Sequence, residues 1–161
     1  MRTIIRQLLP ASLGVLMAGC ALLGKREPDA TLAVYEQADP ALPATRVREV
    51  DVPRTGLKIP VDPFPILTEK DLDSAAFRWT VSGATILLQF NIHGLMVLQE
   101  STTRSRGDHL VIFLNNRPVA AWLNEHPIND GQMLLEGDFG EEEAKQAVAA
   151  FNALAKKQKA R

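Results

Sequence analysis

The chain has 161 residues, 46% of them hydrophobic, and a formal net charge of −1. These values fit one globular domain and exclude a disordered or fibrous chain. So small a charge creates no strong field of one sign, so composition gives no argument for a nucleic-acid partner. The single cysteine excludes an intramolecular disulfide, so an ordinary hydrophobic core must stabilise the fold.

The first 20 residues have the layout of a bacterial export signal. Arg2 and Arg6 form a short basic segment. Residues 8–17 form an apolar stretch that is too short for a membrane-spanning helix, which takes about 20 apolar residues. Leu-Met-Ala-Gly-Cys at residues 16–20 then resembles the lipobox of bacterial lipoproteins, with methionine where leucine is commoner.

This resemblance implies that Cys20 carries lipid. In lipoproteins the cysteine thiol takes a diacylglycerol, a peptidase cuts before the cysteine, and the new amine is usually acylated. Two or three chains anchor a protein stably, at about 0.8 kcal/mol per buried CH₂. We therefore expect residues 1–19 to be a signal peptide and residues 20–30 a lipidated tether. The alternative is an ordinary signal peptide with an incidental or buried cysteine.

Ala21 bears on the expected location. In Gram-negative lipoproteins, alanine after the cysteine resembles the default outer-membrane signal, whereas aspartate there indicates the inner membrane. The expected location is thus the cell envelope, on the outer membrane facing the periplasm if the source is Gram-negative.

The first part of the domain is expected to be mainly extended. Residues 31–36 predict a strand, and residues 38–44, with two prolines, predict a loop. Residues 46–52 and 57–61 predict two more strands. Thr68 then predicts the cap of a short helix that continues to Ala75.

The middle of the chain predicts a hairpin followed by a helix. Residues 76–81 and 84–90 are the expected strands, joined at Ser82-Gly83. Asn91 is a suitable N-cap for a helix over residues 92–102, and Gly107 closes the loop after it.

The last part predicts a second hairpin, a strand and a long helix. Asn115-Asn116 is a favourable turn between strands at residues 108–114 and 117–123. A strand over residues 132–135 follows. Gly140 opens a helix with apolar residues at helical spacing, acids at its start and lysines at its end. The order of elements predicts one α+β domain over residues 31–161, with a mixed, mainly antiparallel sheet and helices on one face.

Two segments carry a more specific pattern: PILTEKDLDSA from Pro65 and LLQFNIHGLMVLQE onwards from Leu87, as far as Val148. They show a strand ending in phenylalanine, glycine in the first helical turn, threonine before a glycine-terminated loop, and a Glu-Glu-Ala helix start. The residues concerned are Phe90, Gly94, Thr102, Gly107, Leu110, Ile128, Gly131, Gly137, Phe139 and Glu142–Ala144.

This pattern resembles the head of the first periplasmic domain of SecD, an accessory subunit of the bacterial protein-translocation channel, over about residues 65–155. Gly140 departs from the usual threonine, and Ala120-Ala121-Trp122 departs from Ser-Ala-Pro. The membrane helices of SecD have no counterpart, so a proton-driven motor is not expected. The resemblance implies a head-like domain that contacts polypeptide or a membrane-complex partner.

No set of residues predicts catalysis or metal binding. His93, His109 and His126 lack metal-ligand spacing, and Asp108 and His109 point to opposite faces of a strand. Nucleophile-elbow, Walker and dinucleotide motifs are missing from the sequence. We expect no catalytic residue, no metal and no cofactor.

Three residues are candidate partner contacts. Arg104 and Arg106 belong to a small basic segment, TTRSRGD, which is either a solvated loop or a contact for a lipid headgroup or partner. Trp122 ends a hairpin, where an exposed tryptophan suits an interface. Trp79 is expected in the core.

These features predict a non-enzymatic, lipid-anchored envelope protein that binds a polypeptide or another envelope component. A structural subunit of an envelope assembly and an enzyme with an unrecognised site are the alternatives.

Overall fold

The structure is a computed structural model that describes residues 29–39 and 41–160. The expected signal peptide, Cys20 and most of the expected tether lie outside these residues. Among the described residues, no helix is long and apolar enough to cross a membrane.

Nine strands and two α-helices make up the described chain, which confirms the predicted α+β class. The elements are β1 (Leu32–Glu36), β2 (Arg48–Asp51), β3 (Lys58–Val61), β4 (Leu67–Thr68), β5 (Leu72–Thr80), β6 (Gly83–Phe90), α1 (Ile92–Arg104), β7 (His109–Leu114), β8 (Arg117–Leu123), β9 (Gln132–Glu136) and α2 (Glu141–Lys159). Short 3₁₀ turns occur at Ala44–Arg46 and Glu69–Asp71.

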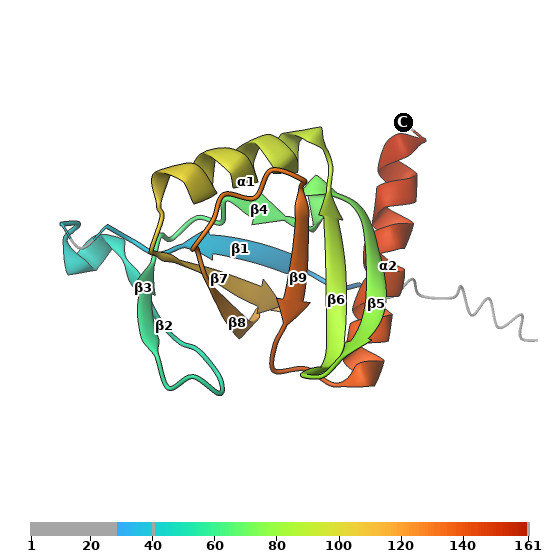
Figure 1. Cartoon of the computed structure of the whole chain (residues 1–161), viewed down its shortest axis with the longest axis horizontal. Helices are drawn as coiled ribbons and strands as arrows, with labels where there is room; N and C mark the ends of the chain where they lie inside the picture. Colours follow the sequence, from blue (N-terminus) through green and yellow to red (C-terminus); the bar gives the residue numbers. More distant parts are fainter. Residues whose placement is uncertain (1–28, 40, 161) are drawn as a thin grey trace, which may run out of the picture.

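The strands form three antiparallel sheets: β4-β1-β7-β8, β5-β6-β9 and the hairpin β2-β3. Figure 1 shows β6 and β9 running across the direction of β1 and β7, with α1 along one side and α2 beside β5. The main core lies where the two larger sheets face each other.

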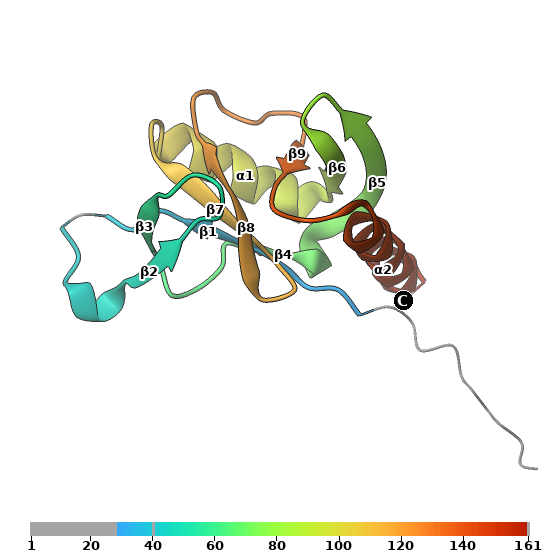
Figure 2. The same ribbon diagram turned by 90° about the horizontal axis from the view of Figure 1, so that it is seen from below.

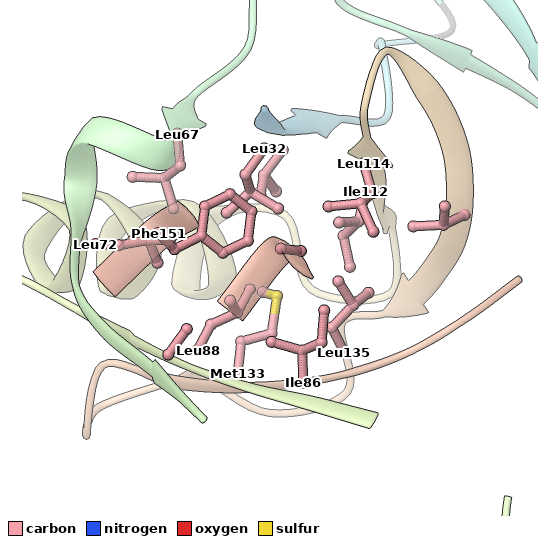
Figure 3. Close-up of a cluster of buried hydrophobic side chains, with 14 of the residues drawn as sticks. Leu32, Leu67, Leu72, Ile86, Leu88, Ile112, Leu114, Met133, Leu135 and Phe151 are labelled. Atoms are coloured by element: carbon pink, nitrogen blue, oxygen red, sulfur yellow. The ribbon is translucent and has the colours of Figure 1, made fainter. Parts of the chain in front are cut away.

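The main core takes buried side chains from both larger sheets and both helices. Phe151 of α2 is fully buried among leucines of β1, β4 and β5, as Figure 3 shows. Leu98 of α1 and Ile86 of β6 are also fully buried. Each such side chain stabilises the fold by about 1.5–3 kcal/mol relative to exposure.

A second, smaller cluster lies on the other face of the four-stranded sheet. Val50, Ile59 and Val61 of the β2-β3 hairpin pack on Val111 and Phe113 of β7. Figure 2 shows this hairpin and α1 on opposite faces of that sheet. Strand β7 is thus covered on both faces, which explains its unbroken apolar run LVIFL after His109.

The helix predicted from Thr68 to Ala75 is wrong beyond its first turn. Thr68 does cap: its Oγ1 accepts from Lys70 N (3.3 Å), and Asp71 Oδ2 accepts from Thr68 N (2.8 Å). However, Leu72 already belongs to β5, where it pairs with Phe90, and Ala75 pairs with Leu88. The long ladder with β6 overrides the local helical preference.

The predicted cap of α1 and the second hairpin turn are confirmed. Asn91 Oδ1 accepts from Gly94 N (3.0 Å). Gly94 is needed there because a Cβ would lie 2.9 Å from the carbonyl oxygen of Asp71. Asn115 and Asn116 both have positive φ, 52° and 64°, as a type I′ turn requires.

Candidate binding surface

A groove of about 370 Å³ separates β8 from β9, the edge strands of the two larger sheets. This volume is within the range of ligand-binding pockets, about 300–1,000 Å³. Six of its seven lining residues have apolar side chains, and the exposed backbone makes the surface itself about as polar as apolar: Ile112, Ala120, Ala121, Trp122, Leu134, Leu135 and Glu136.

One end of the groove is closed by a contact between the two edges. Asp138, just after β9, donates its backbone N–H to the carbonyl oxygen of Val119 in β8 (2.9 Å). A Cβ on Gly137 would lie 2.7 Å from the same oxygen, so glycine is what lets the two chains approach. Beyond this contact, β8 and β9 share no ladder.

Trp122 is half-buried, packs against the main core and lines this groove. The structure therefore places one predicted contact residue on the candidate surface. The Ala120-Ala121-Trp122 segment, a departure from the SecD pattern, forms the β8 wall.

Trp79 is exposed (63%), so its predicted place in the core is wrong. It lies near the end of β5, its ring edge-on to Phe77 at 5.9 Å. The other side chain of this pair, Phe77, also contacts α2: the ammonium of Lys145 lies 5.4 Å from its ring centroid. A hydrogen bond to Glu141 raises the pKa of Lys145 and keeps that ammonium charged. Trp79 lies two residues before the fully exposed Val81, at the tip of the β5–β6 hairpin.

Arg104 lies in the last turn of α1 rather than in a loop, and it pairs with Glu36 at the end of β1. Its Nη2 is 3.0 and 2.9 Å from the two carboxylate oxygens. Glu36 is only 8% exposed, and the hydroxyls of Ser101 and Ser105 also donate to it. Such a buried carboxylate needs a cation and donors, which gives Arg104 a structural role.

Arg106 is exposed and donates from Nε to the carbonyl oxygen of Glu125 (3.0 Å). Neither Arg104 nor Arg106 lines the β8–β9 groove. The structure thus does not bring the three predicted contact residues together.

Comparison with known proteins finds the same fold in solved structures. No family model and no curated protein matches the chain. A solved structure of SecDF, a membrane component that enhances protein export, matches with a TM-score of 0.60 and 20% identity. The match covers 79% of this chain and 64% of that one. The described domain has the fold of part of SecDF.

A second structure, of SecDF in its super-membrane-facing form, matches with a TM-score of 0.57 and 23% identity. It covers 77% of this chain and 19% of that SecDF chain. The resemblance predicted from the sequence is thus confirmed for the fold. The chain spans less than two thirds of the length of either SecDF chain.

The three histidines lie apart. His93 Nδ1 is 2.9 Å from Asp71 Oδ1, His109 Nδ1 is 2.8 Å from Gln37 Oε1, and His126 is exposed. Within residues 29–39 and 41–160, no three metal-binding side chains converge.

Sequence reasoning missed the β9 wall of the groove, formed by Leu134 and Glu136. A strand was predicted here, but the alternate burial along QMLLE appears only in the structure, because the exposed Leu134 is as apolar as its buried neighbours. No local signal tells an edge strand from a central one, because this depends on which strands pair.

Proposed function

We propose that this chain is a lipid-anchored protein of the cell envelope whose domain binds polypeptide without catalysing a reaction. The likeness of its fold to SecDF, a component that enhances protein export, carries the proposal. The groove between β8 and β9, with its apolar side chains and exposed backbone, supports it, since it offers a surface for such a ligand.

The anchor rests on the lipobox-like sequence ending at Cys20. Nine residue steps separate Cys20 from Asp29, the first described residue, and can span about 30 Å when extended. Asp29 lies beside Ala153 and Leu154 of α2. The lipid would hold the domain close to the membrane from the α2 side. With Ala21 after the cysteine, the outer membrane facing the periplasm is the proposed site in a Gram-negative cell.

Metabolic labelling tests the anchor. Cells fed labelled palmitate should incorporate it into the wild-type chain and not into Cys20→Ala. The variant should also retain the uncleaved signal peptide, because the lipoprotein peptidase needs the lipidated cysteine. Label that persists in Cys20→Ala would overturn the proposed anchor.

Photo-crosslinking in living cells tests polypeptide binding. A photoreactive phenylalanine analogue in place of Leu134 should yield adducts with many polypeptides of different mass. The same analogue in place of Met96 of α1, which is 65% exposed and does not line the groove, should yield few. Equal adducts at both positions, or none at Leu134, would contradict the proposal.

A permanent subunit of an envelope assembly is the second candidate. It is favoured by a separate hollow of about 510 Å³ whose lining includes Leu42, Val47 and the 77% exposed Phe64. In the crosslinking experiment this role would give one discrete adduct. In native membrane extracts such a subunit would never migrate alone on size exclusion.

A further inference from the structure

The groove has a second property besides its apolar side chains: it is bordered by backbone groups that no strand pairs. In an antiparallel ladder, hydrogen-bonded and non-hydrogen-bonded residue pairs alternate. A residue in a non-hydrogen-bonded pair points its N–H and C=O away from the partner strand. One backbone hydrogen bond observed at the end of each strand therefore fixes which backbone groups of β8 and β9 face outward.

In β9 the outward groups belong to Leu134 and Glu136. Phe90 N donates to Gly131 O (2.8 Å), next to the paired residues Gln89 and Gln132, so that pair is non-hydrogen-bonded. Because the two kinds of pair alternate along the ladder, Leu134 and Glu136, two and four residues after Gln132, also lie in non-hydrogen-bonded pairs. Their N–H groups and the Leu134 carbonyl point away from β6. Within the described part of the chain, none of these three groups has a hydrogen-bond partner.

In β8 the same reasoning selects Ala121. Asn124 N donates to Asp108 O (2.9 Å), next to the pair of His109 and Leu123, so the pair of Val111 and Ala121 is also non-hydrogen-bonded. The N–H and C=O of Ala121 therefore point away from β7, and Ala121 lines the groove. Outward-facing backbone groups thus lie on both walls.

The β9 edge lacks the usual protection of an edge strand. Proteins commonly cover such edges, shorten them, or place lysine or proline on them. The opposite edge of this sheet, β5, is covered by α2, and the opposite edge of the four-stranded sheet, β4, has only two residues. β9 has five residues, no proline and no lysine, and its Leu134 is 46% exposed.

We infer that β9 is a docking edge for an extended segment of another polypeptide, which pairs with Leu134 and Glu136 and packs an apolar side chain onto the half-buried Trp122. The unpaired donors and acceptor select an extended main chain rather than a lipid or a folded surface. Glu136 is the one charged side chain in the groove lining, so the segment is neutral or basic on its inward face. The inference rests on the proposed polypeptide binding and assigns its place and mode.

Amide exchange of the full-length chain in detergent tests the pairing. The probe is an octapeptide of alternating valine and threonine with a lysine at each end. At saturation, exchange of the Leu134 and Glu136 amides should slow by at least about tenfold. The Met133 and Leu135 amides, which already bond to β6, should change much less. Binding without protection of Leu134 and Glu136 would overturn the inference.

A matched pair of variants provides a second measurement. Leu134→Pro removes the outward N–H without removing a bond to β6, and Leu134→Ala keeps that N–H while shortening the side chain. Peptide affinity should fall roughly tenfold more in Leu134→Pro than in Leu134→Ala, about the effect of one hydrogen bond. Equal affinities would contradict pairing. If Leu134→Pro does not fold, the exchange experiment on the wild type decides.

The outcomes separate this inference from the proposed function. A peptide that binds without either effect removes the docking edge and leaves polypeptide binding intact. No binding, together with no adducts at Leu134 in cells, removes both. Protection of Leu134 and Glu136 that grows with protein concentration in the absence of peptide would assign the edge to a second copy of the chain, against the inference.

Discussion

Arg104 and Arg106 have similar sequence surroundings and different roles in the structure. Arg104 neutralises the buried carboxylate of Glu36, whereas Arg106 is exposed and donates to the backbone carbonyl of Glu125. The difference arises because α1 brings Arg104 against the end of β1, 68 residues away in sequence.

Replacing each arginine in turn tests this assignment. Arg104→Gln should lower the free energy of unfolding by about 1–3 kcal/mol, because a buried carboxylate loses its cation. Arg106→Gln, the control, should change it by less than about 0.5 kcal/mol. Urea unfolding at neutral pH measures both. Equal effects would show that the Glu36 pair contributes nothing specific to stability.

Gly137 shows how one small residue shapes the groove. It permits the contact between Asp138 and Val119 that closes one end.

Gly137→Ala should destabilise the domain by about 1–3 kcal/mol through overpacking against the Val119 carbonyl. Gly140→Ser adds a side chain where nothing lies within 4 Å of a Cβ, and at a helix N-cap it should be neutral or slightly stabilising. A tolerated Gly137→Ala, measured by thermal unfolding, would show that the edges can separate.

Among the elements, α1 is the one whose start is set most clearly by a single side chain. Asn91 accepts from Gly94 N and also donates to the carbonyl oxygen of Lys70 (3.3 Å), so it ties the helix to the turn before β5. The same turn carries the Thr68–Asp71 capping box.

Asn91→Ala should therefore cost about 1 kcal/mol, or somewhat more if the bond to Lys70 contributes. Asn129→Ala, in an exposed loop position, is the control and should be neutral. Far-ultraviolet circular dichroism during chemical unfolding measures the difference. An unchanged midpoint in Asn91→Ala would mean that packing alone fixes the start of α1.

In the whole molecule, β7 connects the two hydrophobic clusters. Its residues alternate between the main core, through Ile112, and the hairpin cluster, through Val111 and Phe113. The β2-β3 hairpin should therefore unfold together with the rest of the domain rather than independently.

Ile59→Ala, in the hairpin cluster, tests this coupling. It should lower the global stability by about 2–5 kcal/mol, as expected for truncating a buried isoleucine. The transition can be followed by the fluorescence of Trp79 and Trp122, neither of which belongs to that cluster. If the tryptophan transition stays in place, the hairpin is an independent unit.

Much of the fold could be predicted from the sequence, whereas most of the candidate site could not. Most of the strands, the Asn91 cap and the type I′ turn at Asn115-Asn116 were predicted correctly, whereas β4 and the first part of β5 were not. Of the groove residues, only Trp122 was singled out in advance. Leu134 and Glu136 matter because their backbone groups lack a partner, and this is a property of sheet order.

The sequence by itself determined the type of most elements, because caps, turns and amphipathic spacing act within a few residues. The division into three sheets, the burial of Glu36 and the exposure of Trp79 were decided only by the tertiary structure. Each depends on contacts between distant segments, such as Arg104 with Glu36 or β5 with β6. The two facing edges, β8 and β9, belong to this second group, since a strand is an edge only when no other strand pairs with its second side.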